Sequence, residues 1–125
     1  MSGATGLEHK LARRQGEIRG TLSWAGTHEA KTLLADQALL PANARLLSIS
    51  INPSGATIED IIVGDGTTGN RWVTITSGLA AGWQDLTLAN RYAVDTTAAR
   101  NKFTFDPDTN ATMTLDIVVR YELCS

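Results

Sequence analysis

An alternation of apolar and polar side chains near the C-terminus constrains the fold more than any other feature of the sequence. The apolar positions are Met113, Leu115, Ile117, Val119, Tyr121 and Leu123, and between them stand Thr114, Asp116, Val118, Arg120 and Glu122. A β-strand places alternate residues on opposite faces, whereas a helix would scatter Asp116 and Arg120 among the apolar positions. The run predicts a strand over residues 111–122, central in its sheet because its inner face is continuously apolar.

A period close to two governs most of the chain after Glu17. Further strands are predicted over residues 17–24, 46–52, 57–63, 71–76, 84–88 and 102–106. Turns are expected at residues 52–55, 64–66 and 81–82, where proline fixes φ and glycine can take a positive φ. The short spacing between strands favours a sandwich over β-α-β units. We therefore predict an all-β fold, an antiparallel jelly-roll-like β-sandwich of about eight strands.

Residues 29–40, with the sequence EAKTLLADQALL, fit neither the strand period nor the helix period. An extended strand ending at Leu40 is favoured, because the residue before a proline is pushed out of the α region and Pro41 follows. A helical turn over residues 35–39 is the alternative.

The N-terminal segment differs in charge from the rest of the chain. Residues 1–20 carry four basic and two acidic side chains, whereas the remaining residues carry seven and eleven. Leu7 and Leu11 are spaced i, i+4, but the stretch between Gly6 and Gly16 is shorter than an isolated helix needs. We expect residues 1–16 to form a flexible basic arm that is ordered by a partner, and residues 17–125 to form the sandwich domain.

Composition excludes several classes of protein. The chain has 125 residues, one cysteine and a formal net charge of −2, which fits one domain without a disulfide framework. The near-neutral net charge does not indicate a basic surface for binding nucleic acid, and no apolar run is long enough to span a membrane. The N-terminus is polar and basic, with no apolar segment of a secretion signal.

Two loops resemble ligand motifs without their structural context. Residues 64–69 read G-x-G-x-x-G, but a strand-like segment follows where dinucleotide binding needs a helix. Residues 106–110 have the oxygen spacing that opens a calcium loop, but Ala111 and Ile117 stand where that loop needs glycine and glutamate. Both loops are interpreted as turns between strands.

No constellation of catalytic residues is evident. The two histidines, His9 and His28, are spaced unlike zinc ligands, and Cys124 is the penultimate residue. Glu59 and Asp60 are adjacent, so a strand would point them to opposite faces. We expect no enzyme activity, no metal and no cofactor.

The three tryptophans are candidates for core packing or for binding. The position of Trp83 after Ala81-Gly82, at the start of a strand, is compatible with partial exposure, but core packing or burial between subunits is the more common fate of any large aromatic side chain, Trp24, Trp72 and Trp83 included. An exposed indole would suit a carbohydrate-binding module, which is kept as an alternative function.

Four segments of the chain resemble small β-sandwich proteins of tailed-bacteriophage particles, and among these the capsid decoration, or cement, proteins. The segments are residues 40–49 (LPANARLLSI), 62–72 (IVGDGTTGNRW), 79–83 (LAAGW) and 117–122 (IVVRYE), and the likeness covers roughly residues 30–123. The resemblance implies a non-enzymatic virion protein on the capsid surface, made in the bacterial cytoplasm. It would bind the major capsid protein at subunit junctions, and would itself be a homotrimer. Phage tail, baseplate or receptor-binding sandwiches are the alternative.

Candidate contact residues follow from both lines of reasoning. On the arm they are Leu7, Leu11, Arg13 and Arg14, and on the body they are Arg71, Trp72 and Trp83.

Overall fold

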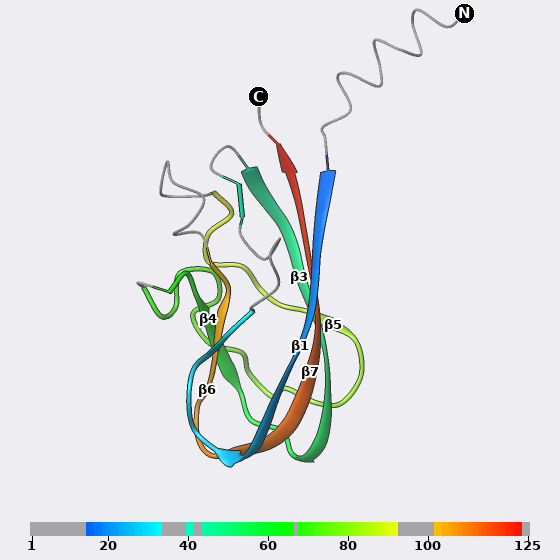
Figure 1. Ribbon diagram of the computed structural model, residues 1–125, viewed down its shortest axis with the longest axis vertical. Helices are drawn as coiled ribbons and strands as arrows, with labels where there is room; N and C mark the ends of the chain where they lie inside the picture. Colours follow the sequence, from blue (N-terminus) through cyan, green and yellow to red (C-terminus); the bar gives the residue numbers. More distant parts are fainter. Residues whose placement is uncertain (1–14, 34–39, 42–43, 67, 93–101, 124–125) are drawn as a thin grey trace, which may run out of the picture.

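Two antiparallel β-sheets pack against each other in the computed structural model, which describes residues 15–33, 40–41, 44–66, 68–92 and 102–123 (Figure 1). One sheet has the order β1-β7-β3-β5 and the other β2-β6-β4. The strands are β1 (Gln15–Thr27), β2 (Lys31–Thr32), β3 (Ala44–Thr57), β4 (Ile61–Gly64), β5 (Gln84–Asp85), β6 (Thr104–Pro107) and β7 (Ala111–Leu123). Nothing in these ranges forms a helix that could cross a membrane.

Successive strands alternate between the two sheets. The strands β1, β3, β5 and β7 form one layer, and β2, β4 and β6 form the other. Between β4 and β5 in the chain, Val73 makes an antiparallel bridge to Val63, which adds a short element beside β4 in the second sheet. With this element included, the two layers form an antiparallel β-sandwich, as the sequence predicts.

The central position of β7 is confirmed. It pairs with β1 on one side and with β3 on the other, so that Ile117 lies opposite both Gly20 and Ile51. Its alternate residues are buried in the order that the sequence pattern predicts, and the observed strand is one residue longer than expected at its C-terminal end. Because both edges of β7 are paired, its inner face meets the core along most of its length.

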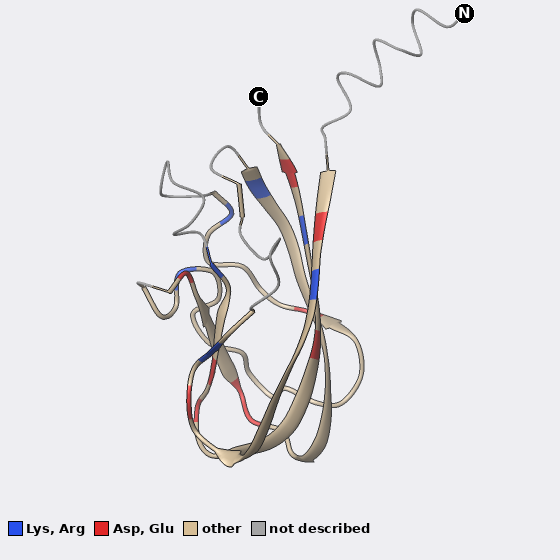
Figure 2. Ribbon diagram, in the orientation of Figure 1, with Lys and Arg blue, Asp and Glu red and all other residues tan. Residues whose placement is uncertain are grey.

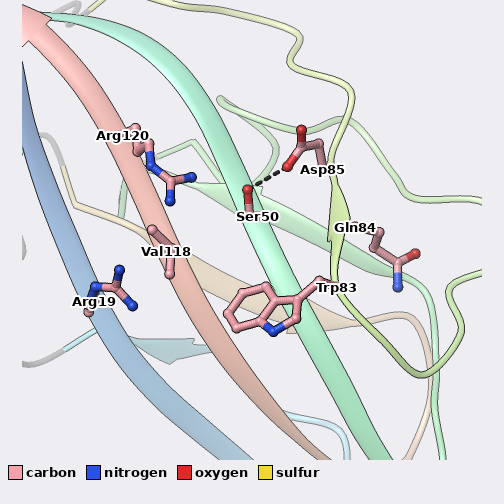
Figure 3. Close-up of a pocket in the computed structure, with 7 residues that line it drawn as sticks. All are labelled: Arg19, Ser50, Trp83, Gln84, Asp85, Val118 and Arg120. Carbon is pink, nitrogen blue, oxygen red and sulfur yellow. Dashed lines mark hydrogen bonds between the residues drawn. The ribbon is translucent and has the colours of Figure 1, made fainter.

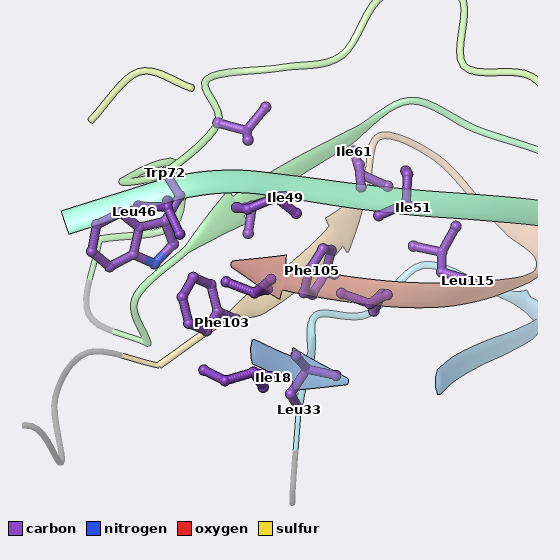
Figure 4. Packing of buried hydrophobic residues seen from close by; sticks show 14 of the residues in the cluster. Ile18, Leu33, Leu46, Ile49, Ile51, Ile61, Trp72, Phe103, Phe105 and Leu115 are labelled. Atoms are coloured by element: carbon purple, nitrogen blue, oxygen red, sulfur yellow. The ribbon is translucent and has the colours of Figure 1, made fainter. Parts of the chain in front are cut away.

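The core lies between the two sheets (Figure 4). Its largest fully buried side chains include Trp72, Phe103, Phe105, Leu46, Ile49, Ile51, Ile61 and Leu115. The rings of Trp72 and Phe103 lie 5.5 Å apart between centroids with a tilt of 32°. The Trp72 indole N–H donates to the carbonyl oxygen of Lys102 at 2.9 Å, so its polar atom is satisfied inside the core.

The turn predicted at residues 52–55 is wrong. These residues continue β3, with Pro53 opposite Leu115 and Ser54 opposite Thr114. The pairing register then shifts between Ser54 and Thr57, and Gly55 has a φ of +129°. Proline and glycine here mark an irregularity inside a strand, which glycine can enter because it lacks a Cβ.

The strand predicted over residues 71–76 is also wrong, since Val73 forms only an isolated bridge. A side chain interrupts the ladder, because the Thr76 hydroxyl oxygen accepts the N–H of Ile61 at 2.9 Å. Residues 58–60 connect β3 to β4 instead of extending the expected strand 57–63.

Other predicted strands are shorter or shifted. Of residues 84–88 only Gln84–Asp85 are in a strand, and the predicted strand 102–106 is observed as Thr104–Pro107. Of the described residues within 29–40, Lys31–Thr32 form β2 and Leu40 is not in a strand, whereas the alternative helical turn over 35–39 lies outside the described residues. Pairing of β1 begins at Gln15, so the last two residues of the expected arm, Gln15 and Gly16, belong to the sheet.

Replacing Gly55 by alanine is expected to destabilise the domain. An added Cβ would lie only 2.5 Å from the Thr112 carbonyl oxygen and 2.8 Å from the Met113 Cα, and both are backbone atoms of the central strand. The positive φ adds strain for any L side chain, so we expect the free energy of unfolding to fall by about 1–3 kcal/mol. Chemical denaturation measures this fall. Gly78→Ala is the matched control, because Gly78 also has a positive φ but nothing lies within 4 Å of the place its Cβ would take; an equal loss in both variants would show that the close approach to β7 contributes nothing.

Candidate functional site

The contact residues chosen from the sequence fall into three groups. Leu7, Leu11, Arg13 and Arg14 lie outside the described residues. Trp72 is fully buried, so in this fold it is a core residue and offers no surface to a partner. Trp83 remains a candidate, because 58% of its surface is exposed.

Arg71 belongs to the loop that follows β4. Its Nε lies 3.3 Å from Asp65 Oδ2, and Asp65 Oδ1 accepts the Thr68 N–H at 2.7 Å. Gly66 has a φ of +91°, and the segment after this loop is not helical. The loop is therefore a turn closed by a nearly buried aspartate, as interpreted from the sequence, and Arg71 contributes to that closure.

Trp83 is held on a fixed backbone. The N–H of Gly82 donates to the Pro53 carbonyl oxygen at 3.3 Å, and Gln84 pairs with Ile51 of β3. The Gln84 amide also donates to the carbonyl oxygens of Ala80 and Gly82, at 2.6 and 3.0 Å. Both neighbours of Trp83 are thus tied to the sheet or to their own loop, which fixes the point from which the indole projects.

Trp83 lines two open hollows on the outer face of the β1-β7-β3-β5 sheet, and Figure 3 shows the residues that line the first of them. The first has a volume of about 460 Å³ and is lined by Arg19, Ser50, Trp83, Gln84, Asp85, Val118 and Arg120. The second has a volume of about 420 Å³ and is lined by Arg19, Gly20, Thr21, Trp83, Asp116, Ile117 and Val118. We call the two hollows, together with the indole that lines both, the Trp83 cleft.

The floor of the Trp83 cleft is formed by residues that face away from the core. Val118 alternates with the inward-facing Ile117 and Val119, yet only 4% of its surface is exposed. Ser50 is 7% exposed and donates its hydroxyl proton to Asp85 Oδ1 at 2.5 Å. The segment containing Trp83 and Asp85 therefore covers part of the outer face, and Figure 3 shows the indole extending over β3 toward Val118.

Two arginines border the Trp83 cleft and share one carboxylate. Glu17 Oε2 accepts from Arg19 Nε at 2.8 Å, and Glu17 Oε1 lies 3.4 Å from Arg120 Nε. Figure 2 shows the acidic and basic positions next to each other in this part of β1 and β7. The Arg19 and Arg120 side chains are 65% and 50% exposed, so both guanidinium groups are accessible to a ligand.

The Arg19 hydrogen bond is the main cause of a lowered pKa at Glu17, and the charges of Arg19 and Arg120 lower it further. We predict that the Glu17 carboxyl titrates below its ordinary value of 4.5, and that Arg19→Ala moves the pKa back toward it. With a folded-state pKa below the unfolded one, the ionised form contributes stability above the unfolded pKa, and this is lost as pH falls through the folded pKa. Carboxyl-carbon NMR titration measures the shift, and an unchanged pKa in Arg19→Ala would contradict the assignment.

The remaining polar residues considered as catalytic or metal-binding candidates lie in loops or on the surface. Asp60 Oδ1 accepts the Thr76 hydroxyl at 3.0 Å and the Leu79 N–H at 2.9 Å. The connection between β6 and β7 is the predicted turn, in which the Asp108 N–H donates to the Asp60 carbonyl oxygen at 2.7 Å. His28 lies on the surface, 3.8 Å from Asp106. Within the described ranges no three His, Cys, Asp or Glu side chains are grouped as metal ligands would be.

Sequence reasoning selected Trp83 but missed the side chains around it. Arg19, Ser50, Asp85 and Arg120 come from four different strands, and only the sheet order brings them together. One signal was present in the sequence: Val118 is apolar at a position that the alternation assigns to the wet face. An apolar residue there indicates that something covers the outer face at that point.

Comparison with solved structures finds this fold in two phage capsids. One match is to the cyanophage Pam1 capsid asymmetric unit, with a TM-score of 0.52 and 17% identity, covering 88% of this chain and 82% of the other. A second is to the acidic stable capsid structure of Helicobacter pylori bacteriophage KHP30, with a TM-score of 0.53 and 16% identity, covering 90% and 95%. Neither the models of protein families nor the curated proteins give a match. The resemblance to phage capsid proteins is confirmed at the level of the fold.

Proposed function

We propose that this chain is a structural protein of a tailed-phage virion, a decoration protein that binds the outer surface of the head where capsid subunits meet. The observation that carries the proposal is the shared fold with chains of two phage capsid structures over nearly the whole domain. The most buried carboxylate of the described residues, that of Asp65, is built into a turn, which is a structural use of this group.

The proposed mechanism is the addition of interface area between neighbouring capsid subunits. The sandwich supplies a rigid platform, and residues 1–14 precede β1, with Leu7, Leu11, Arg13 and Arg14 as the proposed contacts to the major capsid protein. Ordering such a segment costs conformational entropy, which its contacts must exceed. An interface of roughly 1,600 Å² is sufficient for stable attachment, and a homotrimer would multiply it.

Removing residues 1–14 is expected to lower occupancy on capsids without changing the melting temperature of the isolated domain. The cut is placed before Gln15, because Gln15 and Gly16 pair with Glu122 and Tyr121 of β7. Occupancy is measured by incubating purified protein with capsids that lack it, followed by sedimentation and gel densitometry. A full-length variant with Leu7, Leu11, Arg13 and Arg14 replaced by serine is the matched control, since it keeps the length of the segment.

Each result decides one part of the proposal. Loss of occupancy in both variants supports the assigned contacts, whereas loss on truncation alone assigns attachment to other atoms of residues 1–14. A large fall in melting temperature on truncation would show that the segment belongs to the domain core. Full-length protein that binds tails or baseplates, and no capsids, would replace the head with the alternative location.

A further inference from the structure

The Trp83 cleft has the properties of a ligand site that the proposed capsid attachment does not use. The indole is large and exposed, and hydrogen bonds on both sides of it fix its backbone before any ligand arrives. A site that is already ordered loses little conformational entropy on binding. The two hollows that Trp83 lines have volumes of about 460 and 420 Å³, within the usual range for small-molecule sites.

The side chains beside the indole include both hydrogen-bond donors and hydrogen-bond acceptors. Arg19 and Arg120 present amino donors, and Asp85 presents the carboxylate oxygen that Ser50 does not engage. In the second hollow, Thr21 donates to Asp116 Oδ1 at 3.1 Å, and both side chains line the surface. Glu17 pairs with both arginines, so the carboxylates of Glu17, Asp85 and Asp116 outnumber the two guanidinium groups by one. This charge disfavours an anionic ligand and favours an uncharged one that is rich in hydroxyl groups.

A pyranose sugar matches this arrangement in shape and polarity. One face of its ring carries C–H groups that can stack on an indole, and its rim carries hydroxyls that both donate and accept. A protein partner fits less well, because Asp85 and Asp116 line the two hollows, and aspartate is depleted at the centre of protein interfaces. We propose that the Trp83 cleft binds a neutral saccharide chain, which crosses the indole and places hydroxyls in both hollows.

The test observes the three indole N–H groups of the full chain by NMR while cellohexaose, maltohexaose or chitohexaose is added to millimolar concentration. The N–H groups of Trp24 and Trp72 are internal references, because they donate to the carbonyl oxygens of Glu29 and Lys102 inside the domain. We expect at least one of the saccharides to shift the Trp83 signal while the other two signals stay in place.

Two variants assign the shift to the cleft. Trp83→Ala is expected to weaken saccharide binding by at least about tenfold, measured by titration calorimetry. The matched control is Tyr92→Ala, which removes another exposed aromatic ring, 61% exposed, outside the cleft lining and is expected to bind like the wild type. Asp85→Asn keeps the indole and is expected to bind several-fold more weakly, so the proposal stays testable if Trp83→Ala does not fold.

Each contrary result overturns the inference. No shift of the Trp83 signal with any of the three saccharides would do so, and so would unchanged saccharide affinity in folded Trp83→Ala. If Trp83→Ala instead loses occupancy on capsids and no saccharide binds, the cleft is a protein contact. The saccharide test uses isolated protein, so its failure leaves the proposed capsid function standing, and failure of capsid binding leaves the cleft unaffected.

Discussion

Ile117→Asp is expected to leave the chain unfolded at room temperature. Ile117 is 1% exposed and lies at the middle of the central strand, opposite Gly20 of β1 and Ile51 of β3. The substitution removes a buried apolar side chain, at a cost of about 2–5 kcal/mol, and adds an unpaired carboxylate whose burial costs several more. Together these approach the whole free energy of unfolding of a small domain, about 5–15 kcal/mol. Circular dichroism and the one-dimensional NMR spectrum measure the loss.

The control for Ile117→Asp is the neighbouring outward position. Asp116 is exposed, and its side chain accepts one hydrogen bond, from Thr21. Asp116→Ala is therefore expected to change the free energy of unfolding by no more than about 1 kcal/mol. A folded Ile117→Asp variant that melts cooperatively near the wild-type temperature would contradict the inward orientation of Ile117, and with it the register of the central strand.

The parts of the fold that were predictable are those where one strand carries its own pattern. The strand predicted over 111–122 alternates in polarity with Val118 as the apolar exception, and the sequence alone assigned its start, its end to within one residue and its central place. The first strand was predicted from Ile18, Leu22 and Trp24, and the structure extends it at both ends. In both cases the burial of every second residue is a local property, and local patterns can be interpreted without knowing the partner strands.

The errors occurred where tertiary contacts override local signals. Pro53 and Gly55 are turn formers, but β7 offers a continuous partner, and β3 stays paired through both positions. Residues 71–76 are rich in strand formers, but the backbone of this segment bonds at irregular points to β4, with the Thr76 side chain replacing a ladder bond. Propensity within a few residues carries no information about either partner.

The candidate site was predictable only in part, for the same reason. An exposed Trp83 could be expected from the Ala-Gly sequence before it, but its neighbours in the cleft are distant in sequence: Arg19, Ser50 and Asp116 are brought together by the sheet order. Trp72 shows the opposite case. It follows Arg71 in a polar loop and was a candidate for contact, yet the fold turns it fully into the core.

Trp72→Ala is expected to destabilise the domain by about 3–5 kcal/mol, because it removes the largest fully buried side chain. The change also leaves the Lys102 carbonyl oxygen without the indole donor and Phe103 without its ring neighbour. The backbone of Trp72 ties two segments together, since its N–H donates to Val63 and its carbonyl oxygen accepts from Ala89. Loss of the side chain should therefore loosen the loop that contains Trp72 and the segment around Ala89, which hydrogen exchange would detect.

Trp72→Phe and Trp83→Ala separate the causes of that loss. Phenylalanine keeps much of the apolar volume but donates no hydrogen bond, so Trp72→Phe is expected to cost less than Trp72→Ala while still leaving the Lys102 carbonyl unpaired. Trp83→Ala removes an equal side chain that is 58% exposed, and its cost should be about 1 kcal/mol. Urea denaturation of the three variants measures their free energies of unfolding and so ranks the losses of stability. If Trp83→Ala proved as costly as Trp72→Ala, Trp83 would be a core residue, and the exposed platform on which the saccharide site rests would not exist.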